Sequence, residues 1–577
     1  MVGLVGKAGK EEEVELTALE RLAGAGGDLA AALAEKYKDS GIGSVAALRK
    51  RLAPMDEAAT LEATRRLLAV TGGDADLARR LLPFFGVIRE DLQGLPVVIL
   101  PGALYVTESP LRKNTGTHYT PRDLAEKVVE GALEPLLYHV GPLQTADRSQ
   151  WKPKSSQEIL GLKVADIAMG SAAFLVAAAR YLGDALVDAW VREEDEDALK
   201  YRARAGDHAT DADADPVVVG ARRQIIEHCL YGADINPMAV EMAKLSLWLV
   251  SMHRDLKLPF TFVDDRLVVG DALLGITSLE QLEYMHMDPA RGRKVHEAIF
   301  DWTAGVRVKV AELAESRREI AEIELGDDPL GALARKRSRL ADAEVASAQL
   351  RLFADLAVGG ALAREIYDVT APDLDVDGGR GRYGSTAEGW KVSADVASIK
   401  AAEFADAVSR RAEGAEVKAR IQLRRWLALD QADGSLDRRP IHWPLIFPEV
   451  FAERAGGGSK ESGDTLVRPR PGGPGFDAVI GNPPFLGGQK LTGSLGVAYR
   501  EYLVEAIGRG TRGSADLVAY FVLRAHDLLN ATGQTGLIAT NTLAQGDTRE
   551  VGLDQIMAEG ATIHRAVKSG SSNLAGV

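Results

Sequence analysis

The sequence contains a single cysteine, Cys229, among its 577 residues. One cysteine excludes disulfide bonds within the chain, zinc sites built from several cysteines, and iron–sulfur clusters. Methyl transfer to C5 of cytosine needs a nucleophilic cysteine, normally after a proline, whereas Cys229 follows a histidine at the start of an apolar run. We therefore expect Cys229 to be a small buried hydrophobic residue rather than a nucleophile.

Long apolar runs and an excess of positive charge are also lacking. The most apolar stretches carry Arg180, Asp184 and Lys244, so none reaches the ~20 apolar residues of a membrane span. The N-terminus becomes acidic at Glu11, where a secretory signal needs its apolar core. We therefore expect a cytoplasmic protein with no membrane segment. The net charge of −14 does not indicate a polyanion partner, although a local basic cleft can bind DNA on an acidic protein.

The hydrophobic pattern changes along the chain. Apolar positions at helical spacing between residues 13 and 85 predict an α-helical leader. From about residue 95, short β-rich runs alternate with amphipathic helices, which predicts a parallel α/β sheet. The expected strands are Lys163–Ala168, Cys229–Ile235, Arg266–Leu273, Phe476–Asn482 and Thr535–Asn541, and the main helices are Ala172–Val191, Ala239–Met252 and Ala515–Leu529.

Two long charged helices on either side of "GDDPLG" interrupt the sheet between its third and fourth strands. We expect them to pack as a hairpin whose Lys and Arg side chains face solvent, because a charge run on a helix is usually a solvated face. A later stretch, residues 456–475, is rich in Gly, Ser and Pro and predicts a flexible loop.

Small and acidic residues follow the first three strands. After the first strand, Gly170, Ser171 and Ala172 allow a ligand to approach a helix N-terminus. Asp234 ends the second strand, where a carboxylate can accept both hydroxyls of a ribose or cap the next helix. Asp271 ends the third strand in the same way. Together, the three ends predict a nucleoside-binding crevice at the carboxyl edge of the sheet.

The fourth strand ends in "IGNPPF", residues 480–485. The exocyclic amine of a nucleobase is a poor nucleophile because its lone pair is delocalised into the ring. If the side-chain oxygen of Asn482 and the carbonyl of Pro483 accept its two N–H bonds, the lone pair points at a methyl donor. Pro483 and Pro484 fix the backbone, and Phe485 can stack on a flipped base. A rigid turn alone is the simpler interpretation of this stretch, but the three strand ends upstream favour the chemical one.

These motifs resemble the S-adenosylmethionine-dependent amino methyltransferases of DNA, in the order where the cofactor motifs precede the catalytic one. The similarity runs from about Thr117 to about Lys568, without the helical insertion. The combination of "HYTP" and "NPPF" is typical of adenine N6 transfer in that family. The "HW" and "FPEVF" segments before the catalytic motif further resemble the large adenine methyltransferases of type IIG restriction and of the BREX and DISARM phage-defence systems. The resemblance implies a Rossmann-like, mainly parallel α/β sheet, and DNA as partner.

The resemblance also implies the site residues, and it implies no metal. The catalytic set is Asn482, Pro483, Pro484 and Phe485. The set around the S-adenosylmethionine cofactor is Thr117, Tyr119, Thr120, Pro121, Asp166, Ala168, Gly170, Ser171, Phe174, Asp234, Ile235, Asp271, Ala272, Leu273, Asn482 and Asp516. Within it, Asp234 is expected on the ribose, Ile235 against the adenine and Asp271 on the adenine amino group.

The resemblance divides the chain into a helical leader (1–95), a cofactor-binding half (96–278), a helical, coiled-coil-like insertion (279–440) and a catalytic half (441–577). Ile167, Met169 and Ala172 stand where the family has Pro, Cys and Gly, and Ala172 adds a methyl group where the ligand is expected to pass. The family would continue with a target-recognition domain, so we expect recognition to come from a partner subunit or from a longer form of the chain.

Two alternatives stay open. One is methyl transfer to another planar amine, that of protein glutamine or rRNA guanine, although such enzymes are usually compact and lack "HYTP". The other is a non-catalytic methyltransferase-fold subunit of a defence complex. Ala172 and the expected lack of a recognition domain favour this second alternative, whereas the intact "NPPF" motif argues against it.

Overall fold

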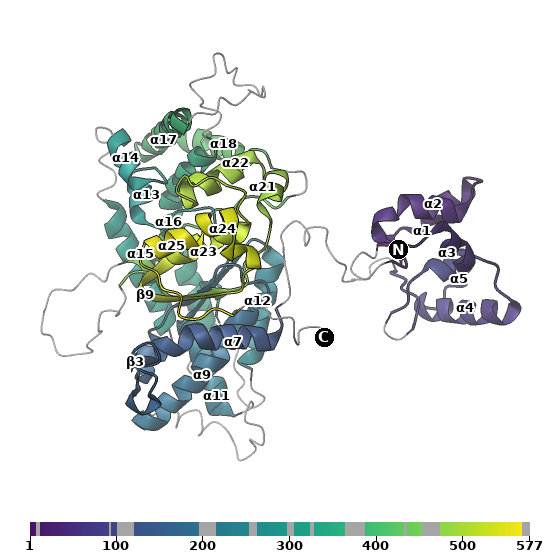
Figure 1. The fold of residues 1–577 in the computed structure, drawn as a ribbon, viewed down its shortest axis with the longest axis horizontal. Helices are drawn as coiled ribbons and strands as arrows, with labels where there is room; N and C mark the ends of the chain where they lie inside the picture. Colours follow the sequence, from purple (N-terminus) through teal and green to yellow (C-terminus); the bar gives the residue numbers. More distant parts are fainter. Residues whose placement is uncertain are drawn as a thin grey trace, which may run out of the picture. The chain divides into compact units, whose positions relative to one another are not determined.

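The computed structural model describes residues 1–6, 12–91, 94–100, 120–195, 215–252, 262–296, 305–323, 328–363, 387–431, 435–452 and 473–567, without the side chains of residues 39 and 387–394. Its contacts divide the chain into two compact units, Met1–Asn114 and Thr115–Val577. Each unit is described by itself (Figure 1).

The N-terminal unit is the expected helical leader, with a small β-ladder that the sequence pattern did not predict. Its helices are α1 (Leu16–Gly24), α2 (Leu29–Lys36), α3 (Val45–Arg51), α4 (Glu57–Val70) and α5 (Ala75–Leu81). Four of them begin after an Asp or Ser whose side chain accepts a backbone N–H of the first turn, which satisfies a donor that the helix leaves unpaired. Strands β1 (Val2–Gly3) and β2 (Glu13–Val14) pair antiparallel. With two residues each, they are too short for a recognisable periodicity.

The second unit contains a parallel α/β sheet, as the alternating pattern predicted. The five strands have the order β7-β6-β5-β8-β9, and all pairs are parallel. Their bounds are β5 Val164–Asp166, β6 Leu230–Asp234, β7 Leu267–Val269, β8 Phe476–Gly481 and β9 Leu529–Leu537. The first four lie within the expected ranges, whereas β9 begins and ends earlier than expected.

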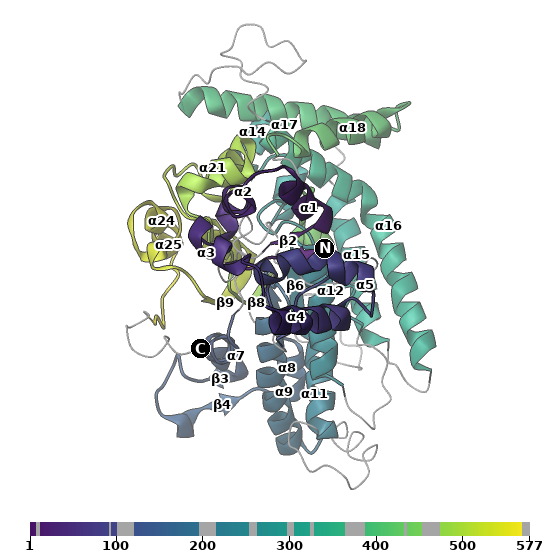
Figure 2. The same ribbon diagram turned by 90° about the vertical axis from the view of Figure 1, so that its right-hand side faces the viewer.

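Both faces of the sheet are covered by helices, which explains the nearly continuous apolar runs of the strands. Ala478 and Ile480 of β8 and Leu230 of β6 belong to one hydrophobic core, and their sequence neighbours Val479 and Tyr231 belong to another. The first core includes α7 (Arg122–Leu133), α9 (Ala173–Glu193), α11 (Pro216–His228) and α12 (Pro237–Val250). In Figures 1 and 2, α9 and α11 lie below the strands, at the opposite end of the unit from α17 and α18.

The second core joins the sheet to the insertion and to the C-terminal helices. The insertion comprises α13 (Leu279–Glu283), α14 (Pro289–His296), α15 (Val306–Glu322), α16 (Pro329–Leu362), α17 (Ala387–Ser409) and α18 (Ala415–Leu427). As expected, α15 and α16 pack against each other. Helix α16 is long and apolar enough to cross a membrane, but 61% of its most apolar window is buried inside the protein. It is therefore a core helix, and the insertion is more than a solvated hairpin.

The "HW" and "FPEVF" segments form the short helices α19 (Trp443–Ile446) and α20 (Pro448–Phe451) against the sheet. The rings of Tyr231 and Phe447 meet edge to face at a centroid distance of 5.1 Å, and Trp443 packs on Phe476 of β8 at 6.0 Å. His442 forms a hydrogen bond from Nε2 to Oδ1 of Asp355 at 2.9 Å, which ties α19 to α16. These segments are therefore structural in this fold.

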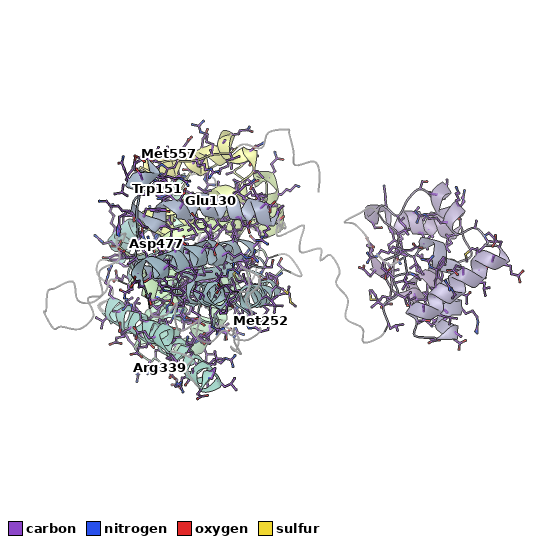
Figure 3. All side chains as sticks on the ribbon, turned by 90° about the horizontal axis from the view of Figure 1, so that it is seen from below. Glu130, Trp151, Met252, Arg339, Asp477 and Met557 are labelled. Carbon is purple, nitrogen blue, oxygen red and sulfur yellow. The ribbon has the colours of Figure 1, made fainter. Side chains whose placement is uncertain are left out.

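A buried ion cluster closes the amino edge of the sheet. Arg317 of α15 lies 3.3 Å from Glu449 of α20 and 3.8 Å from Asp265, measured from guanidinium nitrogen to carboxylate oxygen. Burial alone would raise the pKa of Glu449, but the guanidinium groups of Arg317 and Arg266 hold it below its ordinary value. At the same edge, Asp477, labelled in Figure 3, accepts hydrogen bonds from β5 and β9 neighbours. Arg317 thus ties α15 of the insertion to α20 and to the segment before β7, and Asp477 ties β8 to its two neighbouring strands.

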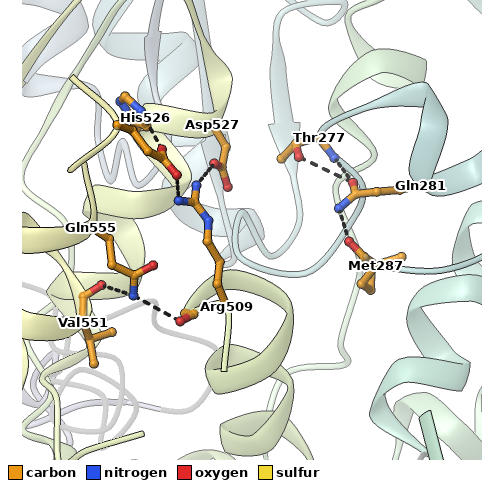
Figure 4. A network of polar contacts seen from close by, with 10 residues as sticks. Thr277, Gln281, Met287, Arg509, His526, Asp527, Val551 and Gln555 are labelled. Atoms are coloured by element: carbon orange, nitrogen blue, oxygen red, sulfur yellow. Dashed lines mark hydrogen bonds and ion pairs between the residues drawn. The ribbon is translucent and has the colours of Figure 1, made fainter. Parts of the chain in front are cut away.

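The C-terminal helices α21 (Gly488–Leu495), α22 (Val497–Tyr502), α23 (Leu517–Leu528), α24 (Gly546–Val551) and α25 (Leu553–Ala558) follow β8 and β9. Side-chain amides secure the loops between elements (Figure 4). Gln281 accepts from Thr277 N at 2.8 Å and donates to Met287 O at 2.9 Å. Arg509, in the segment before α23, pairs with Asp527 of that helix at 3.0 Å. The segments after β7 and before α23 therefore have defined conformations.

Candidate functional site

The strand order places the predicted residues at one edge of the sheet. Asp166 ends β5, Asp234 ends β6, and Asn482 directly follows β8. The chain passes from β5 to β6 and β7 on one side, whereas β8 and β9 lie on the other. The connections thus diverge between β5 and β8, and ligands of open α/β sheets bind in the crevice outside such a point. Asp166 and Asn482 lie on its two sides.

Asp166 is almost fully buried at the end of β5. Its Oδ1 accepts a hydrogen bond from Ala168 N at 3.1 Å, while its buried Oδ2 has no donor among the residues that the structure describes. The pKa of Asp166 is raised to about 8, mainly by burial and to a smaller extent by repulsion from Asp234. A Cβ on Gly481 would lie 2.7 Å from Oδ1. Glycine is therefore required there for β8 to approach Asp166.

Asp234 is tied to the turn that follows β5. Its Oδ2 accepts from Gly170 N at 2.9 Å, and its Oδ1 accepts from Asn236 N at 2.8 Å. The N-cap of α12 is Asn236, whose side chain accepts from Met238 N. The alternative interpretation of Asp234 as that cap is therefore wrong. Gly170 has φ +53°, and a Cβ there would meet nothing within 4 Å, so the turn has the open approach that a ligand needs.

Met169 and Ala172, two residues of this turn that differ from the family pattern, are accommodated by packing. Met169 occupies the space that Gly232 of β6 leaves, since a Cβ on Gly232 would lie 2.2 Å from the Met169 sulfur. Ala172, which stands where the family has Gly, has a left-handed backbone conformation with φ +70°. It is fully buried and belongs to the hydrophobic core. The expectation that its methyl group stands in the path of the ligand is therefore wrong.

Asp271 lies just after β7 and is buried. Both of its carboxylate oxygens accept hydrogen bonds. Oδ1 accepts from Leu273 N at 2.9 Å and Leu274 N at 3.2 Å. Oδ2 accepts from the hydroxyl of Tyr499 at 2.7 Å. Burial raises the pKa of Asp271, and the Tyr499 hydrogen bond opposes that rise. The carboxylate is thus held in one orientation.

Asn482 is oriented by a residue from the "HYTP" motif. Its Nδ2 donates to Oγ1 of Thr120 at 3.1 Å, which fixes the amide plane. Its Oδ1 is buried and accepts from no donor in the described part of the chain. A buried acceptor without a donor carries a desolvation cost that a ligand N–H would remove. Asn482 therefore presents an acceptor to the crevice.

The loop that carries the two prolines is clamped by the start of α23. Leu486 N donates to Oδ1 of Asp516 at 3.2 Å, and Leu486 O accepts from Leu517 N at 3.0 Å. Asp516 also caps α23 by accepting from Val518 N. A Cβ on Gly488 would lie 2.2 Å from the carbonyl carbon of Ser514. Gly488 therefore allows close packing against Ser514, and helix α21 begins at this residue.

The remaining predicted residues fall into three groups. Thr117 and Tyr119 lie outside the described residues. Pro121, Ser171 and Ile235 are exposed, and Ala168 is half-buried, near the turn and the strand ends. Phe174, Ala272 and Leu273 are buried in the two hydrophobic cores. Sequence reasoning missed Tyr499 and the contact of Thr120 with Asn482, because neither carries a local signal.

Other parts of the described structure offer no competing site. No cluster of three or more His, Cys, Asp or Glu side chains suited to a metal occurs among the described residues. A cavity of about 290 Å³ lies between α12, α16 and the residues before β7. None of the residues that line it belongs to the predicted site. Cys229 is buried and donates through its sulfur to the carbonyls of Ile159 and Leu160, as a structural cysteine does.

A comparison with family models finds one match, described as "Eco57I restriction-modification methylase", over residues 228–574. The match covers more than half of the chain and includes Asp234, Asp271, Asn482 and Asp516. Asp166 and the turn after it precede the matched residues. No curated protein matches the sequence.

Proposed function

The chain belongs to the Eco57I restriction-modification methylase family, and from this premise we propose that it transfers a methyl group from S-adenosylmethionine to the N6 amino group of adenine in DNA. The family membership supports DNA methylation in a restriction-modification setting. The choice of an amino nitrogen rests on the chemistry of Asn482 and its surroundings, and the choice of adenine rests on the resemblance of "HYTP" together with "NPPF" to the adenine N6 methyltransferases.

The observation that carries the proposal is the arrangement of the Asn482 amide. Thr120 engages Nδ2, and the buried Oδ1 has no donor among the described residues. An amino group on a flipped base offers two N–H bonds, and Oδ1 of Asn482 accepts one while the carbonyl of Pro483 accepts the other. The nitrogen then becomes more sp³-like and its lone pair points out of the base plane. Phe485, half-buried beside the prolines, stacks on the extruded base.

The residues on the other side of the crevice fit a nucleoside cofactor with a positive charge. Oδ2 of Asp166, which has no donor in the described part of the chain, accepts from the ammonium of the methionine portion. The open turn at Gly170 lets the backbone approach the ligand. Each carboxylate oxygen of Asp234 can accept a second hydrogen bond, and these positions accept the ribose hydroxyls. Exposed Ile235 covers the adenine, and Asp271 accepts from its amino group. When bound, S-adenosylmethionine supplies an electrophilic methyl group on its sulfonium sulfur.

The protein's own contribution to rate is orientation and water exclusion. The hydrogen bonds between Leu486 and the start of α23 hold the loop, and the rings of the two prolines fix its backbone torsions. Oδ1 of Asn482 and the carbonyl of Pro483 are therefore in place before the base arrives. After transfer, the methylated adenine nitrogen carries a positive charge and releases its proton to solvent. No side chain with a matched pKa is needed as general base.

The cellular setting follows from this activity. We propose a cytoplasmic protein that acts on DNA within a restriction-modification or phage-defence system, as in the type IIG, BREX and DISARM enzymes that it resembles. We propose that a partner subunit contributes to target recognition.

The experiment that tests the proposal is methyl transfer from radiolabelled cofactor to DNA, RNA and a glutamine-containing release-factor peptide, with the protein alone and with its genomic neighbours. We expect label only in DNA and only on adenine. Asn482→Ala is expected to abolish transfer and to leave the dissociation constant of the cofactor nearly unchanged. Tight cofactor binding without transfer under every condition would make the chain a non-catalytic subunit and refute the proposal.

A further inference from the structure

Tyr499 connects the end of β7 to the helices that follow the catalytic motif. It lies on α22, which comes after "NPPF" in the chain, and its hydroxyl donates to Oδ2 of Asp271 at 2.7 Å. Both side chains are buried, with 5% of Tyr499 and 6% of Asp271 exposed. A short hydrogen bond to a buried carboxylate is strong, because the acceptor is shielded from water.

The ring of Tyr499 is itself held by Arg438. The guanidinium carbon lies 5.4 Å from the ring centroid. Arg438 also donates to the carbonyls of Leu427 and Leu429 at the end of α18 and of Leu495 at the end of α21, at 3.1, 2.7 and 2.7 Å. Figure 1 shows α18, α21 and α22 gathered in one region of the unit. The position of the Tyr499 hydroxyl is therefore fixed by three helices.

The hydrogen bonds to Asp271 leave it one acceptor position. An ionised carboxylate accepts about four hydrogen bonds, and among the described residues Asp271 accepts three, from Leu273 N, Leu274 N and the Tyr499 hydroxyl. Two of these fill Oδ1, so the remaining position is on Oδ2, beside the tyrosine hydroxyl. The direction of that lone pair depends on the donor that shares the oxygen.

We propose that Tyr499 is a positioning residue for cofactor recognition: its hydroxyl holds Oδ2 of Asp271 so that one lone pair faces the amino group of the cofactor's adenine. This inference rests on the proposed function, in which Asp271 accepts from that amino group. Without the hydroxyl, the buried carboxylate loses a donor that stabilises its charged form and fixes its rotation. The site then distinguishes poorly between an adenine amino group and the oxygen of hypoxanthine.

The fold provides a matched control on the same helix. Tyr502 is also fully buried, three residues further along α22. Its hydroxyl contacts Gly275 N and O at 3.4 and 3.5 Å, in the loop after β7, and in the described part of the chain no hydrogen bond joins it to Asp271. Tyr499→Phe and Tyr502→Phe therefore remove the same atom from equally buried positions. Both keep the ring, and circular dichroism with thermal unfolding checks that both variants fold.

The test is calorimetric binding of S-adenosylhomocysteine and S-inosylhomocysteine to the wild type and both variants. A hydrogen bond to a charged acceptor predicts a roughly ten- to hundredfold wild-type preference for the adenosyl compound. We expect Tyr499→Phe to reduce that preference to a few-fold and Tyr502→Phe to retain it. The lost preference in Tyr499→Phe should return partly at higher pH, because removal of the donor raises the pKa of Asp271, whereas a packing defect would not respond to pH.

The outcomes separate this inference from the proposed function. A wild-type preference that survives in Tyr499→Phe overturns the role of Tyr499. Equal wild-type binding of both compounds overturns the role of Asp271 and this inference with it, while methyl transfer to adenine stands. A wild type that binds neither compound overturns the proposed cofactor and hence both proposals.

Discussion

Replacement of Thr120 by Val tests how the catalytic amide is oriented. Thr120 is 7% exposed, and its Oγ1 accepts from Asn482 Nδ2 at 3.1 Å. Val has nearly the same volume, so the change removes the acceptor and leaves the packing. A neutral hydrogen bond contributes about 1 kcal/mol, and an untethered amide spends part of its time with Nδ2 where Oδ1 must be. Together these effects predict a kcat roughly tenfold lower in Thr120→Val.

The assay is single-turnover transfer of labelled methyl to duplex DNA, alongside calorimetric binding of S-adenosylhomocysteine. Thr120→Ser keeps the hydroxyl and should retain most of the wild-type rate. We expect cofactor affinity to change little in either variant. If Thr120→Val instead weakened cofactor binding and left the rate at saturation unchanged, Thr120 would serve the cofactor directly and our account of Asn482 would be wrong.

Three further predictions follow from the site and its surroundings. Cofactor affinity should rise with pH up to about 8, because Asp166 must lose its proton to pair with an ammonium and burial raises its pKa to about 8; calorimetry in buffers of different ionisation enthalpy should show proton release on binding. Ala172→Val should destabilise the fold by more than 1 kcal/mol, because the backbone is left-handed there and the added methyl groups are buried, whereas Ala172→Gly should be nearly neutral; thermal melts compare them. Arg317→Met leaves the carboxylate of Glu449 buried without its main partner and should cost about 3–5 kcal/mol in denaturant unfolding. Since the guanidinium groups hold the folded-state pKa of Glu449 below its ordinary value, the stability that this carboxylate contributes is present above pH ~4.5 and is lost as the pH falls through its folded pKa.

The sheet was predictable from sequence where its strands are covered on both faces. The central strands β5, β6 and β8 read as apolar runs because helices bury each face. The edge strand β9 was placed too late, at 535–541 instead of Leu529–Leu537. Its first half, "LNATGQ", is polar and partly exposed, and it resembles a turn rather than a strand. An edge strand has fewer neighbours to impose a hydrophobic pattern, so its bounds depend on pairing that the sequence does not display.

The site was predictable only as a set of motifs at strand ends. The strand order brings Asp166, Asp234 and Asn482 to one edge, which the alternation of strands and helices allowed us to expect. The contacts between motifs were not predictable. Thr120 and Asn482 are 362 positions apart in the chain, and a buried aromatic such as Tyr499 has the helical spacing of an ordinary core residue. Their roles depend on the packing of separate elements, which a single sequence does not encode locally.

The most direct measurement of the central claim is mass spectrometry of nucleosides from DNA incubated with S-adenosylmethionine and the protein, with its genomic neighbours present. Our account predicts N6-methyladenine with the wild type, a reduced amount with Thr120→Val and none with Asn482→Ala. Methylated cytosine, or wild-type amounts of N6-methyladenine from Asn482→Ala, would contradict it.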